Sequence, residues 1–186
     1  VDLLRERADH RDAVATVRPA APAPGRLLDD SFLRILPAPL REPRRAWLAI
    51  LTGYALSIVG SLALAYVIAK FAPTLAKPDF AGLTGLTAII ALVVLSPLIE
   101  TLIMGGVLVI LQKFLSPAGS ILTSALLWGL VHSLGAASWG FAIWWPFLIF
   151  STLFVVWRQR GFWAGIAVAC ATQALPDLVP GLAAAG

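Results

Sequence analysis

The sequence is poor in the residues that most often bind metals or form disulfides. Its 186 residues include one cysteine, Cys170, and two histidines, His10 and His132. A single cysteine excludes an intrachain disulfide and a thiolate metal cluster. A zinc-type site needs three or four ligands, and the hydrophobic part of the chain offers only Glu100, His132 and, further along, Asp177. No metal and no cofactor are therefore predicted.

Charge is also scarce, because 13% of the residues are charged and 59% are hydrophobic. This balance lies far from that of soluble domains and predicts a polytopic membrane protein, with the lipid bilayer as its first partner. Nine of the fourteen lysines and arginines precede Ala46. They flank the first hydrophobic segment and are interpreted as topology signals, so no nucleic-acid partner is expected. The first residues lack a signal-peptide pattern, and membrane insertion is expected to depend on internal segments.

The hydrophobic pattern divides the chain into a tail and a membrane domain. Residues 1–45 mix both charges with a proline-rich stretch and predict a cytoplasmic tail. Within it, Asp30 or Ser31 could cap a short interfacial helix at 32–36, and a disordered chain is the alternative. Residues 46–186 predict an all-α bundle of about five transmembrane spans, with a turn at 116–119 and with Pro176 and Pro180 interrupting the fifth span. The spans are 47–69, 82–111, 121–134, 141–157 and 162–175.

The lysines and arginines near the ends of these spans predict the orientation. The tail, Lys113, Arg158 and Arg160 fall on one side, and Lys70 and Lys77 on the other. The positive-inside rule then places the N-terminus in the cytoplasm and the C-terminus outside. The expected location is the bacterial cytoplasmic (inner) membrane.

Glu100, His132 and Asp177 lie within or beside the predicted spans, where ionisable residues are expensive and usually functional. Measured along their helices, Glu100 and His132 are each about 20 Å from the same membrane face, which predicts that they meet in an antiparallel helix pair. Two interpretations are open for such a pair. Glu100 could be a general base for a water that His132 helps to hold, or the pair could be a buried polar contact that fixes helix register.

Two segments resemble the motifs of a known family, the CAAX-protease and bacteriocin-processing (CPBP, or Abi) membrane proteins. Pro97-Leu-Ile-Glu100-Thr-Leu-Ile-Met-Gly105-Gly resembles the first motif, Glu-Glu-x-x-x-Arg, and Trp128-Gly-Leu-Val-His132 resembles the second, Phe-x-x-x-His. Residues 158–169 are similar to the approach to the third motif, His-x-x-x-Asn, so the resemblance covers roughly residues 83–178. It implies that Glu100 activates water for peptide hydrolysis and that His132 helps to position it.

The sequence also departs from these motifs. Thr101 stands in place of the second glutamate and Gly105 in place of the arginine. In the family, the third-motif histidine and asparagine would polarise the scissile carbonyl, but here the two positions fall on Ala169 and Gln173, or on Cys170 and Ala174. A shifted register would instead make Gln173 and Asp177 the four-residue pair.

These departures lead to three expectations for function. The first is a CPBP-like pseudoenzyme with an eroded active site, serving as a non-catalytic subunit or binding partner in a larger membrane complex. The alternative is an intramembrane endopeptidase that uses Glu100 and His132 on a membrane-associated peptide or prenylated C-terminus. A second alternative is a subunit that ligates a macrocyclic pigment or haem through His132.

Overall fold

The structure is a computed structural model that describes residues 27–78 and 84–185. These residues form helices and connections, with no strand among them. Five helices are long and apolar enough to cross a membrane, as expected of an integral membrane protein, and the prediction of an all-α fold with five such segments is confirmed. Their bounds are Ala46–Phe71, Gly85–Leu111, Pro117–Gly135, Ala137–Arg160 and Phe162–Ala185.

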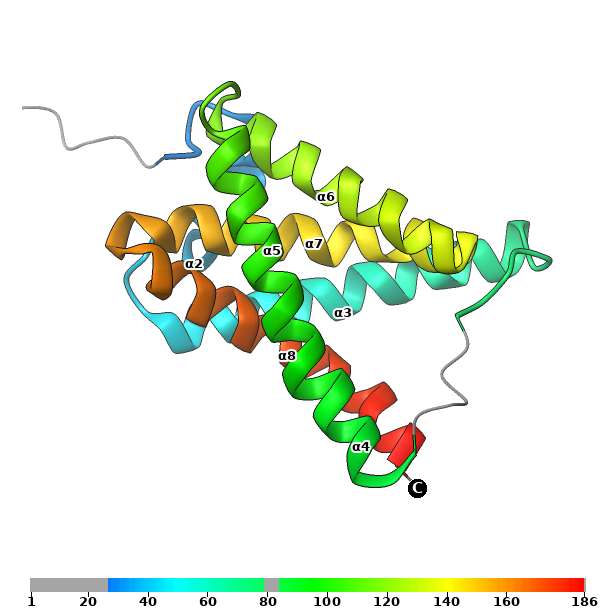
Figure 1. The fold of residues 1–186 in the computed structure, drawn as a ribbon. Coiled ribbons are helices and arrows are strands. Elements are labelled where there is room, and N and C mark those ends of the chain that lie inside the picture. Colours follow the sequence, from blue (N-terminus) through cyan, green and yellow to red (C-terminus); the bar gives the residue numbers. More distant parts are fainter. Residues whose placement is uncertain (1–26, 79–83, 186) are drawn as a thin grey trace, which may run out of the picture.

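Helix α7 (Ala137–Trp157) is the central helix of the bundle (Figure 1). It packs against α3 (Ala46–Phe71), α6 (Pro117–Gly135) and α8 (Phe162–Ala185), and α5 (Ser96–Leu111) crosses over it. The second half of α7 is almost continuously buried. A helix that is apolar on every face is stable only when it is surrounded by other helices or by lipid.

The second span changes its helical form near the middle. It begins as α4 (Gly85–Ile89), continues as the π-helix η2 (Ile90–Leu95), and becomes α-helical again in α5. Pro97, the second residue of α5, has no N–H to donate to the preceding π-helical turn. Widened π turns of this kind are frequent next to functional side chains. Here the π-helix ends at Leu95, five residues before Glu100.

Helix α6 begins earlier than predicted. Ser116 is its N-cap, and the Ser116 Oγ accepts a hydrogen bond from the Gly119 N–H at 3.2 Å. Pro117 occupies the first helical position, where its missing N–H has no consequence. The predicted turn at 116–119 is therefore the start of the helix. At the other end, Ala136 alone separates α6 from α7, so these two helices form a tight antiparallel hairpin.

Helix α8 is continuous from Phe162 to Ala185, so the prediction that Pro176 and Pro180 interrupt it is wrong. The two prolines lie one turn apart and therefore remove backbone donors from one side of the helix only. The remaining hydrogen bonds and the packing of α8 against α4, η2 and α5 maintain the helix. As a consequence, the residues between and around these prolines keep a defined helical position.

The described part of the predicted tail packs against the bundle. Ser31, rather than Asp30, caps the short 3-10 helix η1 (Phe32–Ile35), which is followed by α2 (Ala38–Arg41). Apolar side chains on this segment are buried in the core: Leu28, Leu33, Leu36 and Leu40. Residues 1–26 of the predicted tail lie outside the described residues.

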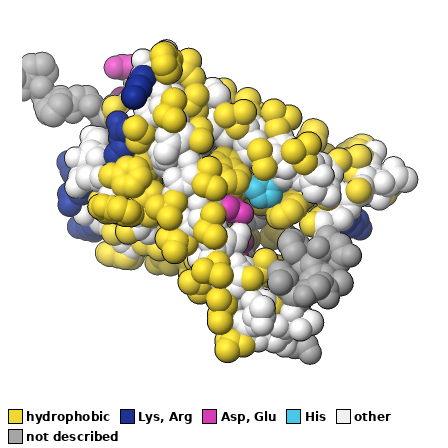
Figure 2. Space-filling view, in the orientation of Figure 1, with side chains coloured by type: hydrophobic (Ala, Val, Ile, Leu, Met, Phe, Trp, Pro, Cys, Tyr) yellow, Lys and Arg dark blue, Asp and Glu magenta, His cyan; other side chains and the backbone are white. Residues whose placement is uncertain are grey.

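The basic side chains concentrate at one end of the bundle (Figure 2). Arg44 and Arg45 precede α3, and Arg158 and Arg160 follow α7 in the short 3-10 helix η3 (Arg158–Arg160), while Lys70 lies in the last turn of α3. Helices α3 and α7 run side by side in opposite directions (Figure 1), so the two arginine pairs share one end. This distribution agrees with the predicted grouping of the basic residues.

Candidate functional site

Glu100 and His132 face each other from α5 and α6. The Glu100 Oε1 and His132 Nε2 atoms are 3.9 Å apart. The prediction that helical rise brings these two residues to one level is confirmed. At 3.9 Å the two atoms are too far apart for a direct hydrogen bond. Figure 2 shows an acidic and a histidine side chain next to each other, with hydrophobic side chains around them.

The His132 ring is fixed by its own helix and by aromatic neighbours. Its Nδ1 lies 2.8 Å from the carbonyl oxygen of Trp128, one turn earlier on α6. A carbonyl oxygen can only accept, so Nδ1 carries a proton and donates it, which leaves Nε2 as the atom that faces Glu100. The ring packs edge-on against Trp139 at 4.6 Å between centroids and is tilted against Phe147 at 5.4 Å.

The Glu100 carboxylate is held by two donors. The Ser96 hydroxyl, one turn earlier on α5, donates to Glu100 Oε1 at 2.9 Å. The Gln173 amide of α8 donates from Nε2 to Glu100 Oε2. The amide oxygen of Gln173 in turn accepts a hydrogen bond from the buried Thr101 hydroxyl at 3.0 Å. Each carboxylate oxygen therefore has a donor from the protein, and the side chain has a defined orientation.

These groups line a cavity of about 230 Å³. Asp177, one turn after Gln173 on α8, lines the same cavity, so two carboxylates and one imidazole face a shared space. The remaining wall is mostly apolar and consists of Leu92, Trp139, Ile143, Phe147, Phe150 and Pro180, with Ser96 next to Glu100.

The structure brings together all four side chains proposed from the sequence: Glu100, His132, Gln173 and Asp177. Sequence reasoning missed Ser96 as a partner of Glu100. The sequence does carry a signal for this contact, because Ser96 and Glu100 are four residues apart and such residues lie on one face of a helix. The role of Thr101 had no local signal, since its partner is 72 positions away in the chain.

Within residues 27–78 and 84–185, no group of three or more His, Cys, Asp or Glu side chains is placed to hold a metal ion. Comparison of the chain with protein-family models, with curated proteins and with solved structures found no match. The interpretation of the site therefore depends on its geometry and on the motifs in the sequence.

We expect the substitution Gln173→Leu to destabilise the bundle by about 2 kcal/mol. It leaves the buried Thr101 hydroxyl without its acceptor and removes one donor from Glu100, and buried polar groups without partners cost about 1–3 kcal/mol each. The measurement is the free energy of unfolding in a reversible detergent titration. The matched control is Gln112→Leu at the end of α5, which removes an amide outside this network and should change stability much less.

Proposed function

We propose that the protein is an intramembrane peptide hydrolase of the CPBP type, located in the bacterial cytoplasmic membrane with its N-terminus in the cytoplasm and its C-terminus outside. Glu100 is the general base and His132 is its partner in positioning the attacking water. The substrate class is a peptide bond in a membrane-associated segment, because the cavity is lined by side chains of membrane-spanning helices.

The observation that carries this proposal is the separation between Glu100 and His132. Both side chains are fixed by bonds to other groups, yet their facing atoms are 3.9 Å apart and do not bond each other. A pair that only fixes helix register would gain most from a direct hydrogen bond. A separation of this size instead allows one water molecule to lie within hydrogen-bond distance of both Glu100 Oε1 and His132 Nε2.

The chemistry then requires no further reactant. The water oxygen attacks the carbonyl carbon of the scissile peptide while one of its protons passes to the Glu100 carboxylate. The C–N bond breaks when the tetrahedral intermediate collapses, and the protonated Glu100 returns that proton to the leaving nitrogen. The products are a new carboxyl group and a new amine. Ser96 and Gln173 keep the carboxylate oriented throughout.

A specific observation favours a second candidate, a non-catalytic CPBP-like subunit of a membrane complex. In the register that places Gln173 at the third-motif asparagine, the histidine position falls on Ala169, which is fully buried and has no polar group. One N–H of Gln173 is already donated to Glu100, so only its second N–H remains for an oxyanion. Each missing oxyanion donor typically lowers the rate by about 10²–10³.

The arginine of the first motif has no space in this bundle. A Cβ atom built at Gly105 would lie 2.9 Å from the Ile166 side chain and 2.9 Å from the Phe154 ring. Helices α5, α7 and α8 therefore pack closely at this position, and a long basic side chain would separate them. Any hydrolysis by this protein proceeds without that arginine, which also favours a slow enzyme or a binding subunit.

The experiment that separates the two candidates starts from full-length protein purified in mild detergent and reconstituted in vesicles with membrane-anchored peptides. Cleavage in water enriched in ¹⁸O, with one ¹⁸O in each new carboxyl group, would show that the peptide bond is hydrolysed and would support the hydrolase. The variant His132→Gln should then lower the rate by about a hundredfold. Absence of cleavage together with a stoichiometric membrane-protein partner in the native preparation would support the subunit instead. Ligation of a pigment or haem by His132 stays a prediction from the sequence.

A further inference from the structure

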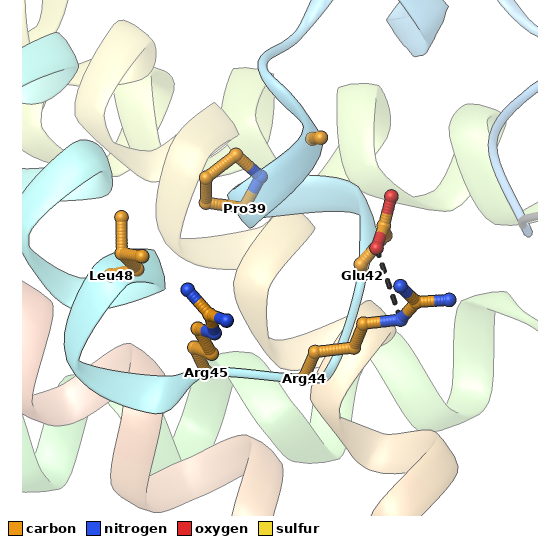
Figure 3. Close-up of a pocket in the computed structure, with 6 residues that line it drawn as sticks. Pro39, Glu42, Arg44, Arg45 and Leu48 are labelled. Atoms are coloured by element: carbon orange, nitrogen blue, oxygen red, sulfur yellow. Dashed lines mark ion pairs between the residues drawn. The ribbon is translucent and has the colours of Figure 1, made fainter.

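A second pocket, outside the candidate site, lies at the arginine-rich end of the bundle where α2 meets the start of α3 (Figure 3). Its volume is about 230 Å³, and it is lined by Ala38, Pro39, Glu42, Arg44, Arg45 and Leu48. Arg44 and Arg45 bring two guanidinium groups to this pocket. Proteins often bind phosphate with arginine, because the guanidinium group can donate two parallel hydrogen bonds to phosphate oxygens.

The three arginines of this region have different partners. Arg41 donates from Nε to the Leu36 carbonyl oxygen at 2.8 Å and forms an ion pair with Asp29, so it holds the preceding segment in place. Arg44 Nε lies 3.2 Å from Glu42 Oε2, but its side chain is 78% exposed.

Arg45 has no ion pair within the part of the chain that the structure describes. Figure 3 shows its guanidinium directed between Pro39 and Leu48, away from Glu42. Arg45 is therefore the cation that the pocket leaves available for a ligand.

The backbone at this pocket adds to the positive potential. Arg45 is the N-cap of α3 and makes no side-chain capping bond. The N–H groups of the next three residues, Ala46, Trp47 and Leu48, precede the first intrahelical bond, which the Ala49 N–H donates to the Arg45 carbonyl oxygen at 3.0 Å. These N–H groups and the aligned helix dipole favour an anion near Arg45 and Leu48.

The surroundings of the pocket indicate which anion it meets. Trp47 and Leu51, one turn apart on α3, are 61% and 54% exposed. They begin an apolar surface directly beyond the arginines, and tryptophan is enriched at the membrane interface. A ligand that fits these surroundings is amphipathic: its charged group lies beside the arginines, and its hydrocarbon part lies along α3.

We propose that this pocket binds the phosphate of an anionic phospholipid headgroup, with Arg45 as its main contact, Arg44 as its second contact, and the acyl chains lying along the exposed face of α3. The Glu42 carboxylate neutralises part of Arg44 and limits the affinity.

The test is native mass spectrometry of the full-length protein with added phosphatidylglycerol, phosphatidylcholine or inorganic phosphate. We expect phosphatidylglycerol to be retained over phosphatidylcholine, and Arg45→Gln to lower its retention about fivefold, as expected for the loss of one charge near an anionic headgroup. The matched control is Arg160→Gln, which removes an arginine that lies over the Trp157 ring, outside the pocket, at the same end of the bundle.

A second variant has the opposite expected sign. Glu42→Gln removes the acidic neighbour of Arg44 and should raise phosphatidylglycerol retention several-fold, a gain that misfolding would not produce. Equal losses in Arg45→Gln and Arg160→Gln would overturn the proposal, because they would show general attraction of the basic end to anionic lipid. Retention of inorganic phosphate without selective retention of phosphatidylglycerol would overturn the assignment to lipid.

Discussion

The substitution Glu100→Gln is expected to lower peptide hydrolysis about a thousandfold while leaving the protein folded. Glutamine has the size of glutamate: its one amide oxygen can accept from Gln173, and its NH2 group can donate to the Ser96 hydroxyl oxygen, so the hydrogen-bonded frame is retained. It cannot accept a proton from the attacking water, and a positioned general base contributes roughly 10²–10⁴ in rate. The measurement is the single-turnover cleavage rate in vesicles, with the unfolding free energy recorded for the same samples.

The matched control for this substitution is Asp30→Asn, which makes the same chemical change at an exposed position next to the N-cap of η1. It should cleave at the wild-type rate. A Glu100→Gln protein that folds and cleaves as fast as the wild type would contradict the general-base role. If neither the wild type nor Glu100→Gln cleaves the peptide, but Glu100→Gln no longer binds a membrane-protein partner, the carboxylate is needed for assembly of the complex. That result would support the non-catalytic candidate.

The meeting of Glu100 and His132 could be predicted because it depends only on helical rise and on a short connection. Two helices joined by a tight turn run antiparallel, so equal numbers of residues from the turn reach equal depths. The predicted depths agreed, and the two side chains are 3.9 Å apart. The sequence also carries a signal for Ser116 as an N-cap, because serine followed by proline is a typical helix start, although residues 116–119 also fit the pattern of a turn.

The positions of Gln173 and Asp177 could not be predicted in the same way. Both lie on α8, and their approach to Glu100 depends on how α8 crosses α5 and on whether the helix survives Pro176 and Pro180. Proline usually ends or kinks a helix, so the sequence pattern favoured an interruption. The packing of α8 against the second span stabilises it instead, and this contact between distant segments has no periodic signal in the sequence.

The close approach of α6 and α7 gives the largest expected effect on stability. A Cβ atom at Gly140 would lie 1.8 Å from the Ser133 Oγ, 2.2 Å from the Gly129 carbonyl oxygen and 2.6 Å from the Ser133 backbone nitrogen. Two of these atoms belong to the backbone and cannot move without separating the helices. We therefore expect Gly140→Ala to destabilise the bundle by about 3 kcal/mol, measured as the free energy of unfolding in a reversible detergent titration.

The same substitution at Gly106 on α5 is the matched control, because a Cβ there meets nothing within 4 Å. Alanine is the better helix former by about 1 kcal/mol, so Gly106→Ala should be neutral or slightly stabilising. Equal effects at both positions would contradict the packing argument. The α6–α7 contact also sets the site, since His132 of α6 packs against Trp139 of α7 with 4.6 Å between ring centroids. Gly140→Ala should thus displace His132 from Glu100 and lower any hydrolysis, whereas Gly106→Ala should leave it unchanged.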